Sequence, residues 1–191
     1  MNRYLQLFIL VLALSVSACS LARSFPDKYD ADIQQAGKRY LPSYDWQLWK
    51  AQLFQESRLD PAAVSPVGAA GLAQFMPATW AETTRQLGMG QISPHLAKQS
   101  IIAGAYYQGK QIRIWKAPRS AEDRYSLGAA SYNAGAGNII KSQRMCAGAN
   151  GYADIIRCLP QVTGKHATET TTYVQRIWRY WSQMMLSRGP Q

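Results

Sequence analysis

The chain has 191 residues, of which 47% are hydrophobic and 17% are charged. This length and composition suit one globular domain with its own core and exclude two large domains. The formal net charge of +10 favours a polyanionic partner, so nucleic acid, an anionic membrane surface and the bacterial cell wall are the candidates.

The first 18 residues are predicted to be a signal peptide. Arg3 precedes a mostly apolar run from Leu5 to Val16, which is too short to span a bilayer because a spanning helix needs about 20 residues. The sequence VSAC, which ends at Cys19, resembles a lipoprotein box, in which the cysteine is acylated and becomes the mature N-terminus. The alternative is ordinary cleavage after Ala22 with loss of Cys19. Both predict an exported, periplasmic domain, and lipidation of Cys19 would attach it to the outer membrane.

Residues 19–40 are polar and show no clear periodicity. They are predicted to form a tether or a loosely packed lead-in, and the folded catalytic domain is predicted to span residues 41–191.

The next segment is predicted to be an amphipathic helix. Trp46, Trp49 and Leu53 fall on one helical face, and Ser43 is the expected N-cap. The residue before Pro61 is biased away from helical geometry, so the helix should end near residue 57. This places Glu56 in its last turn.

The second half of the chain is predicted to be a series of helices. Ser120 is expected to cap the helix that delivers Tyr132 and Asn133 to its C-terminal end. The small residues at 134–137 then predict a tight turn where a sugar chain has room to approach the backbone. The expected helices cover residues 77–87, 94–115, 121–132, 138–146 and 168–186, with 94–115 as the longest pattern.

Cys146 and Cys158 remain once Cys19 is cleaved off or lipidated. In an oxidising compartment such a pair usually forms a disulfide, and the alternative is two buried free thiols. No metal site is expected, because neither cysteine has a CxxC partner or a nearby histidine pair.

Glu56 is the candidate catalytic acid. At the C-terminal end of a helix and beside aromatic rings, both the helix dipole and burial disfavour its ionised form and raise its pKa. A raised pKa is what a general acid needs near neutral pH. Considered without its neighbours, Glu56 could equally be an ordinary solvated glutamate. The residues around it in the sequence decide between a catalytic acid and a surface residue.

Three blocks of sequence resemble the signature of lytic transglycosylases of the soluble-lytic-transglycosylase (SLT) type, a branch of the lysozyme-like superfamily. The resemblance spans roughly residues 41–186, and the order of the blocks along the chain matches the family. The blocks are Glu56-Ser57 followed by Ser65, Gly68-Ala69, Gly71-Leu72, Gln74, Met76-Pro77 and Thr79; then Ser131-Tyr132-Asn133-Ala134-Gly135-Ala136-Gly137; then Glu169-Thr170-Thr171-Thr172-Tyr173-Val174.

The resemblance implies a mainly α, lysozyme-like fold (an α+β superfamily): a helical, bundle-like domain with a substrate cleft and at most a small β-hairpin region. It also implies a peptidoglycan lyase that cleaves the MurNAc-β-1,4-GlcNAc bond without water and leaves 1,6-anhydroMurNAc ends. Glu56 would act first as acid and then as base. The implied substrate-binding residues are Ser65, Gln74, Met76, Tyr132, Asn133, Glu169 and Tyr173.

A single carboxylic acid fits this chemistry. Most glycosidases use two carboxylates, but the only one near Glu56 in the sequence is Asp60, whose place before Pro61 favours a turn.

Two alternatives stay open: a hydrolytic muramidase, and an inactive peptidoglycan-binding protein on the same fold. No cofactor is expected. Peptidoglycan glycan strands are the expected partner, a secretion or division machine stays open as another, and no motif supports nucleic acid.

Overall fold

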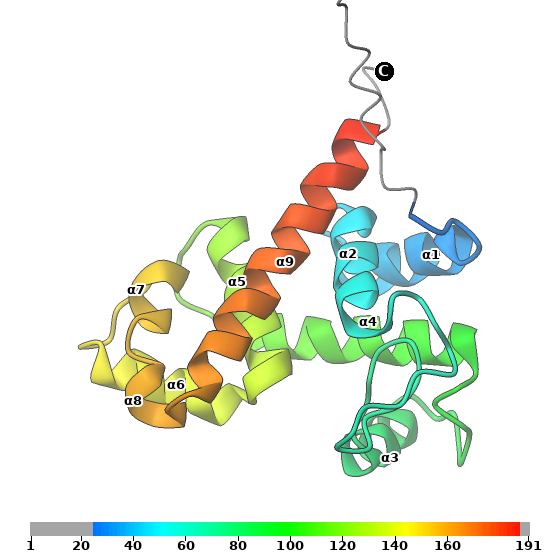
Figure 1. Cartoon of the computed structure of the whole chain (residues 1–191), viewed down its shortest axis with the longest axis horizontal. Coiled ribbons are helices and arrows are strands. Elements are labelled where there is room, and N and C mark those ends of the chain that lie inside the picture. Colours follow the sequence, from blue (N-terminus) through cyan, green and yellow to red (C-terminus); the bar gives the residue numbers. More distant parts are fainter. Residues whose placement is uncertain (1–24, 188–191) are drawn as a thin grey trace, which may run out of the picture.

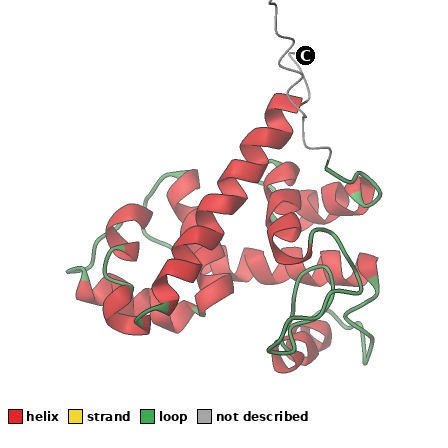
Figure 2. Ribbon diagram, in the orientation of Figure 1, coloured by secondary structure: helices red, strands yellow, loops and turns green. Residues whose placement is uncertain are grey.

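The structure is a computed structural model that describes residues 25–187, and these residues form a mainly helical domain (Figures 1 and 2). The helices are α1 (Asp30–Tyr40), α2 (Trp46–Ser57), α3 (Pro77–Gln86), α4 (Ala97–Ile114), α5 (Ala121–Ala134), α6 (Ala136–Met145), α7 (Tyr152–Ile156), α8 (Pro160–Thr163) and α9 (His166–Ser187). Within the described range, β-pairing is limited to isolated bridges in the loop between α2 and α3. The predicted fold class is therefore confirmed.

Helix α2 lies at the centre of the domain. It packs against α9 and α1, and Figure 1 shows α9 crossing the molecule beside it. Trp49 and Leu53 are fully buried, and the polar Gln52 is buried as well. Gln52 accepts a hydrogen bond from Tyr125 at 2.8 Å and donates one to Gln108 at 3.3 Å, which satisfies its amide inside the core. The helix is thus covered on more sides than an amphipathic pattern predicts.

The start of α2 differs from the prediction by two residues. Asp45, not Ser43, is the N-cap, and its Oδ1 accepts a hydrogen bond from the Gln47 backbone N–H at 2.7 Å. At the other end Arg58 adopts a left-handed conformation and ends the helix, so Glu56 lies in the last turn as predicted.

The prediction of a loosely packed lead-in is wrong for residues 30–40. They form α1, which packs against α2 and α4 and buries Ile33 and Ala36. An ion pair joins the buried Lys50 of α2 to the partly exposed Asp30 at 2.6 Å. Few apolar residues mark the buried face of α1, which is why its sequence shows no clear period. The predicted signal peptide and Cys19 lie outside the described residues.

The later helices follow the predicted order. Ser120 caps α5 by accepting a hydrogen bond from the Asp123 backbone N–H at 3.0 Å. Helix α6 begins at Ala136, two residues earlier than predicted, and α9 with 22 residues is longer than α4 with 18. Within residues 25–187, no helix combines the length and the hydropathy needed to cross a membrane.

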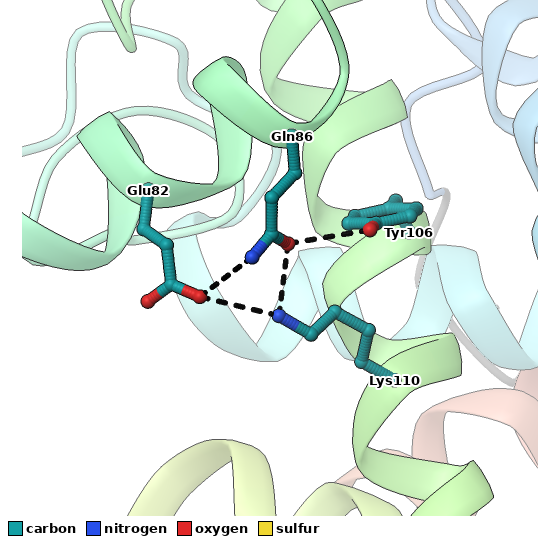
Figure 3. Close-up of polar contacts among 4 residues, drawn as sticks. All are labelled: Glu82, Gln86, Tyr106 and Lys110. Atoms are coloured by element: carbon teal, nitrogen blue, oxygen red, sulfur yellow. Dashed lines mark hydrogen bonds and ion pairs between the residues drawn. The ribbon is translucent and has the colours of Figure 1, made fainter.

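Polar contacts hold α3 against α4 at the surface (Figure 3). Gln86 of α3 accepts hydrogen bonds from Lys110 at 2.9 Å and from Tyr106 at 3.2 Å, and Lys110 lies 3.4 Å from Glu82. Exposed pairs of this kind contribute little to stability. They orient α3, whose first residues follow directly on the loop that carries Gln74 and Met76.

The predicted disulfide between Cys146 and Cys158 is confirmed. The two residues are 12 apart in sequence, and the bond ties the end of α6 to the segment after α7. By the loop-entropy model, replacing both cysteines with serine is expected to lower the free energy of unfolding by about 3 kcal/mol. Thermal unfolding of the wild type with and without reductant, beside the double variant, measures this loss. An unchanged melting temperature after reduction would contradict it.

Candidate active site

All eight of the predicted catalytic and substrate-binding residues line one cleft. The cleft has a volume of about 560 Å³ and is formed by the end of α2, the loop after it, the end of α5 and the first turns of α9. The predicted residues found there are Glu56, Ser65, Gln74, Met76, Tyr132, Asn133, Glu169 and Tyr173. The fold therefore brings together three sequence blocks that are separated by up to 117 positions.

Burial raises the pKa of the Glu56 carboxyl from 4.5 to about 8. The hydroxyl of Tyr173 donates a hydrogen bond to Glu56 Oε1 at 2.5 Å, and this contact lowers the pKa but is outweighed by burial. Glu56 is accordingly protonated at neutral pH and still reaches the cleft. The pKa of Tyr173 is itself raised well above 10, chiefly by burial and then by the nearby Glu56, so Tyr173 remains a neutral donor.

Among the described residues that line the cleft, Glu169 is the only carboxylate besides Glu56, and it is not placed to assist Glu56. The Glu169 side chain is 70% exposed and lies 3.9 Å from His166 on the same helix. Asp60 is exposed, and its Oδ1 accepts a hydrogen bond from the Ala62 backbone N–H at 2.8 Å. Asp60 is thus a turn residue, as predicted.

The loop of residues 63–75 forms one wall of the cleft and is held by backbone carbonyls. Ser57 fastens it to α2 by donating to the Leu72 carbonyl at 2.9 Å. The Gln74 side-chain amide donates to the Gly71 carbonyl at 2.9 Å and to the Ala63 carbonyl at 3.2 Å. Ser65 Oγ accepts from the Ala69 backbone N–H at 3.0 Å. Ser65 and Gln74 therefore shape the loop, and their contacts with a sugar remain a prediction.

Tyr132 and Asn133 connect the end of α5 to the other walls. The Tyr132 hydroxyl donates to the Ala73 carbonyl at 2.7 Å, and Asn133 accepts a hydrogen bond from Thr170 of α9 at 2.8 Å. The Tyr132 ring also packs edge-on against Tyr107. Neither residue bonds Glu56 directly, so Tyr173 is the one predicted residue that does so.

Six further residues line the cleft that the sequence did not assign to substrate binding, although Ala69 and Thr172 belong to the quoted blocks. Thr168, Thr172 and Arg176 lie on α9 at intervals of four residues and share a face with Glu169 and Tyr173. Because residues three or four apart on a helix are neighbours, the positions of Glu169 and Tyr173 predict that these three residues also face the cleft. The remaining missed residues are Gln55, Val67 and Ala69.

Within residues 25–187, no group of three or more histidine, cysteine or acidic residues is arranged to hold a metal ion. The chemistry that the cleft can perform with its own groups is proton transfer by Glu56, positioned by Tyr173.

Comparison with known proteins identifies the family. The family model described as "Transglycosylase SLT domain" matches residues 33–154. The chain is 28% identical over 167 residues to the membrane-bound lytic murein transglycosylase F of Actinobacillus pleuropneumoniae, a match that covers 80% of this chain and 33% of that protein.

Two solved structures share the fold. An inactive glutamate-to-glutamine mutant of the lytic transglycosylase Slt from Pseudomonas aeruginosa has a TM-score of 0.68 and 26% identity, covering 87% of this chain and 25% of that one. The 70 kDa soluble lytic transglycosylase of Escherichia coli has a TM-score of 0.67 and 25% identity, covering 86% and 25%. This chain thus spans a third or less of the length of these relatives. With its sequence blocks, its helical fold and the matched family model in agreement, the chain belongs to the transglycosylase SLT domain family.

Proposed function

We propose that this chain is a peptidoglycan lytic transglycosylase that cleaves the MurNAc-β-1,4-GlcNAc bond without water and leaves 1,6-anhydroMurNAc ends. The observation that carries the proposal is the placement of Glu56, which is bonded by Tyr173 and whose pKa is raised by burial, in a cleft whose described lining places no second carboxylate beside it. The names of the relatives, and the inactive glutamate-to-glutamine mutant of the Pseudomonas aeruginosa enzyme, support it.

The reaction needs one acid that becomes a base. Glu56 donates its proton to the glycosidic oxygen as the C1–O bond breaks, and GlcNAc leaves with a new hydroxyl group. The carboxylate that remains takes the proton of the C6 hydroxyl, and the C6 oxygen forms a bond to C1. The proton on Glu56 is thereby restored, and no water is consumed. The internal hydroxyl competes well because its effective concentration is high, and the hydrogen bond from Tyr173 stabilises the intermediate carboxylate.

The reaction products distinguish this proposal from a muramidase. Purified sacculi digested by the enzyme should release muropeptides whose muramic acid ends are lighter by one water than the reducing ends made by a hydrolase. Mass spectrometry before and after borohydride reduction separates the two, since anhydro ends are not reduced. Reducible ends as the main product would establish hydrolysis and refute the transglycosylase proposal.

The raised pKa of Glu56 predicts the high-pH limb of activity. Because free enzyme must hold the proton, kcat/KM is expected to fall about tenfold per pH unit above pH 8. In Tyr173→Phe the bond that lowers the pKa is lost, so the limb should move to higher pH while kcat decreases because the carboxyl is less well oriented. Tyr152→Phe changes a partly buried tyrosine outside the cleft and is the control. An unmoved limb in Tyr173→Phe would contradict the assignment of this pKa to Glu56.

We also propose that the domain works in the periplasm, exported through residues 1–18 and anchored to the outer membrane by lipidation of Cys19. A Cys19→Ala variant labelled with a palmitate analogue tests the anchor. Loss of label and of membrane fractionation supports lipidation, and an unlabelled wild type supports plain cleavage.

A further inference from the structure

A second pocket lies at the ends of α2 and α5 that are remote from the cleft. It has a volume of about 590 Å³ and is formed by the segment before α2, the end of α4 and the start of α5. Glu56 and Tyr132 occupy the opposite ends of the same two helices. At a rise of 1.5 Å per residue, α2 separates the pocket from the catalytic acid by roughly 15–20 Å.

The pocket is strongly cationic. Its lining contains Arg113, Lys116, Arg119 and Arg124 and no acidic residue. Among the described residues, no carboxylate lies within ion-pair distance of any of these four. A concave surface lined by one sign of charge concentrates the electric field and attracts ions of the opposite sign.

Hydrogen bonds hold the guanidinium groups of Arg119 and Arg124 in place. Arg119 donates to Asn150 at 2.8 Å and to the Ala117 carbonyl at 3.2 Å, and it lies over the Trp115 ring at 5.4 Å. Arg124 donates to the same carbonyl at 3.3 Å. Nη1 of Arg119 and Nε of Arg124 are buried without an acceptor in the part of the chain that the structure describes. The other guanidinium nitrogens of Arg119 and Arg124, two residues that line the pocket, are the donors left for an oxyanion.

Desolvation and the charge of Arg124 lower the pKa of Arg119, and the charge of the nearby Asp123 offsets part of this effect. The fold therefore holds these like charges together against their repulsion, which a bound anion would relieve.

The other walls of the pocket are apolar and aromatic. Tyr40, Leu41 and Pro42 line one side, and Tyr44, Ile112 and Trp115 line the rest. A ligand that fills the pocket should thus combine an oxyanion with a small apolar portion. A short peptide that ends in a carboxylate has this character, and arginine forks match a carboxylate in two-point geometry.

We propose that this pocket binds a carboxylate-bearing stem peptide of peptidoglycan, and so holds the wall at a point remote from the bond being cleaved. The inference rests on the proposed function, because stem peptides reach this pocket only if peptidoglycan is the substrate. The pocket and the cleft would engage the same network through different groups, and binding at two linked points raises the overall affinity for intact wall.

The ligand class is tested by NMR with N-acetyl-D-alanyl-D-alanine as the probe. The acid is expected to shift the Nε–H signals of Arg119 and Arg124 in a saturable way, and its C-terminal amide is not. In the Arg113→Gln, Lys116→Gln double variant the affinity should fall about tenfold or more, as expected for loss of charge-assisted hydrogen bonds. Equal shifts with acid and amide would refute a carboxylate site. Stronger shifts with inorganic phosphate or phosphatidylglycerol vesicles would assign the pocket to phosphate or lipid and overturn the peptide proposal.

The role in wall binding is tested by co-sedimentation with intact sacculi, in a Glu56→Gln background so that the wall is not digested. The Arg113→Gln, Lys116→Gln variant should bind several times more weakly than a Lys141→Gln, Arg157→Gln control, which removes the same charge from exposed positions outside the pocket and the cleft. Equal binding by the two would overturn the inference. This outcome is independent of the product analysis of the active enzyme, so failure of the inference and failure of the proposed function remain distinguishable.

Discussion

Replacing Glu56 with glutamine is expected to reduce the release of muropeptides from sacculi by about a thousandfold or more, because positioned acid catalysis commonly contributes up to 10⁴. Glutamine keeps the size of the side chain and can still accept the hydrogen bond from Tyr173, but it has no proton to give. Turbidity loss of a sacculus suspension and chromatography of the soluble products measure the effect.

The controls are two other carboxylates changed in the same way. Asp60→Asn removes the exposed acid of the turn, and Glu169→Gln removes the exposed acid at the cleft edge. The Asp60 variant should retain wild-type activity, and the Glu169 variant should lose far less activity than Glu56→Gln. Equal lysis by Glu56→Gln and wild type would show that Glu56 is not the acid. If Glu56→Gln loses lytic activity but still binds sacculi, the wild-type chain is an enzyme and not an inactive peptidoglycan-binding protein.

The same substitution is expected to stabilise the fold at neutral pH. The pKa of Glu56 rises from 4.5 to about 8 on folding, so the folded state binds the proton more tightly and stability decreases as pH rises from about 4.5 to 8. By pH 7 this loss amounts to at most about 3 kcal/mol, and glutamine does not suffer it. The melting temperature of Glu56→Gln should therefore exceed that of wild type at pH 8 and converge with it near pH 4.

The second large effect is expected at Gly71. This residue has a φ of +78°, and a Cβ there would lie 2.0 Å from the backbone carbonyl oxygen of Pro94. Gly71→Ala combines an unfavourable backbone conformation with a clash that no side-chain rotation relieves, and it should destabilise the domain by about 3 kcal/mol or more. The displaced loop also carries Gln74, so activity per folded molecule should fall as well. Urea unfolding and sacculus lysis measure the two losses separately.

Gly68→Ala is the matched control. Its φ of +85° is similar, but a Cβ there has no atom within 4 Å. Only the backbone term applies, about 1–2 kcal/mol. If both variants lose the same stability, the close approach to Pro94 is not what fixes the loop.

The position of Glu56 was predictable from the sequence because it depends on local rules. The aromatic period before Glu56 and the Pro61 stop signal together place the acid in a last turn. The binding residues, Tyr173 among them, were implied by the resemblance of the three sequence blocks to the family and not by periodicity. What sequence could not supply are contacts made across the fold. Tyr132 bonds Ala73, 59 positions away, and no periodicity encodes such a partner.

The errors have physical causes too. Helix α1 buries only Ile33, Ala36 and Gly37, so few apolar residues mark its inner face, although Ile33 and Ala36 belong to the core around α2. Ser43 and Asp45 are both good caps, and the choice between them depends on where the chain turns after Leu41. The cationic pocket joins three segments that no linear motif connects.

The wall of the cleft formed by residues 63–75 is secured through main-chain oxygens of Ala63, Gly71 and Leu72. The donors in these bonds are Gln74 and Ser57, and the side chains of Val67 and Met76 take no part in them. Val67 is 74% exposed and Met76 44% exposed, and both line the cleft. These two positions are therefore open to exchange, in evolution or in the laboratory, and libraries at Val67 and Met76 should yield enzymes with altered glycan preference whose stability is unchanged.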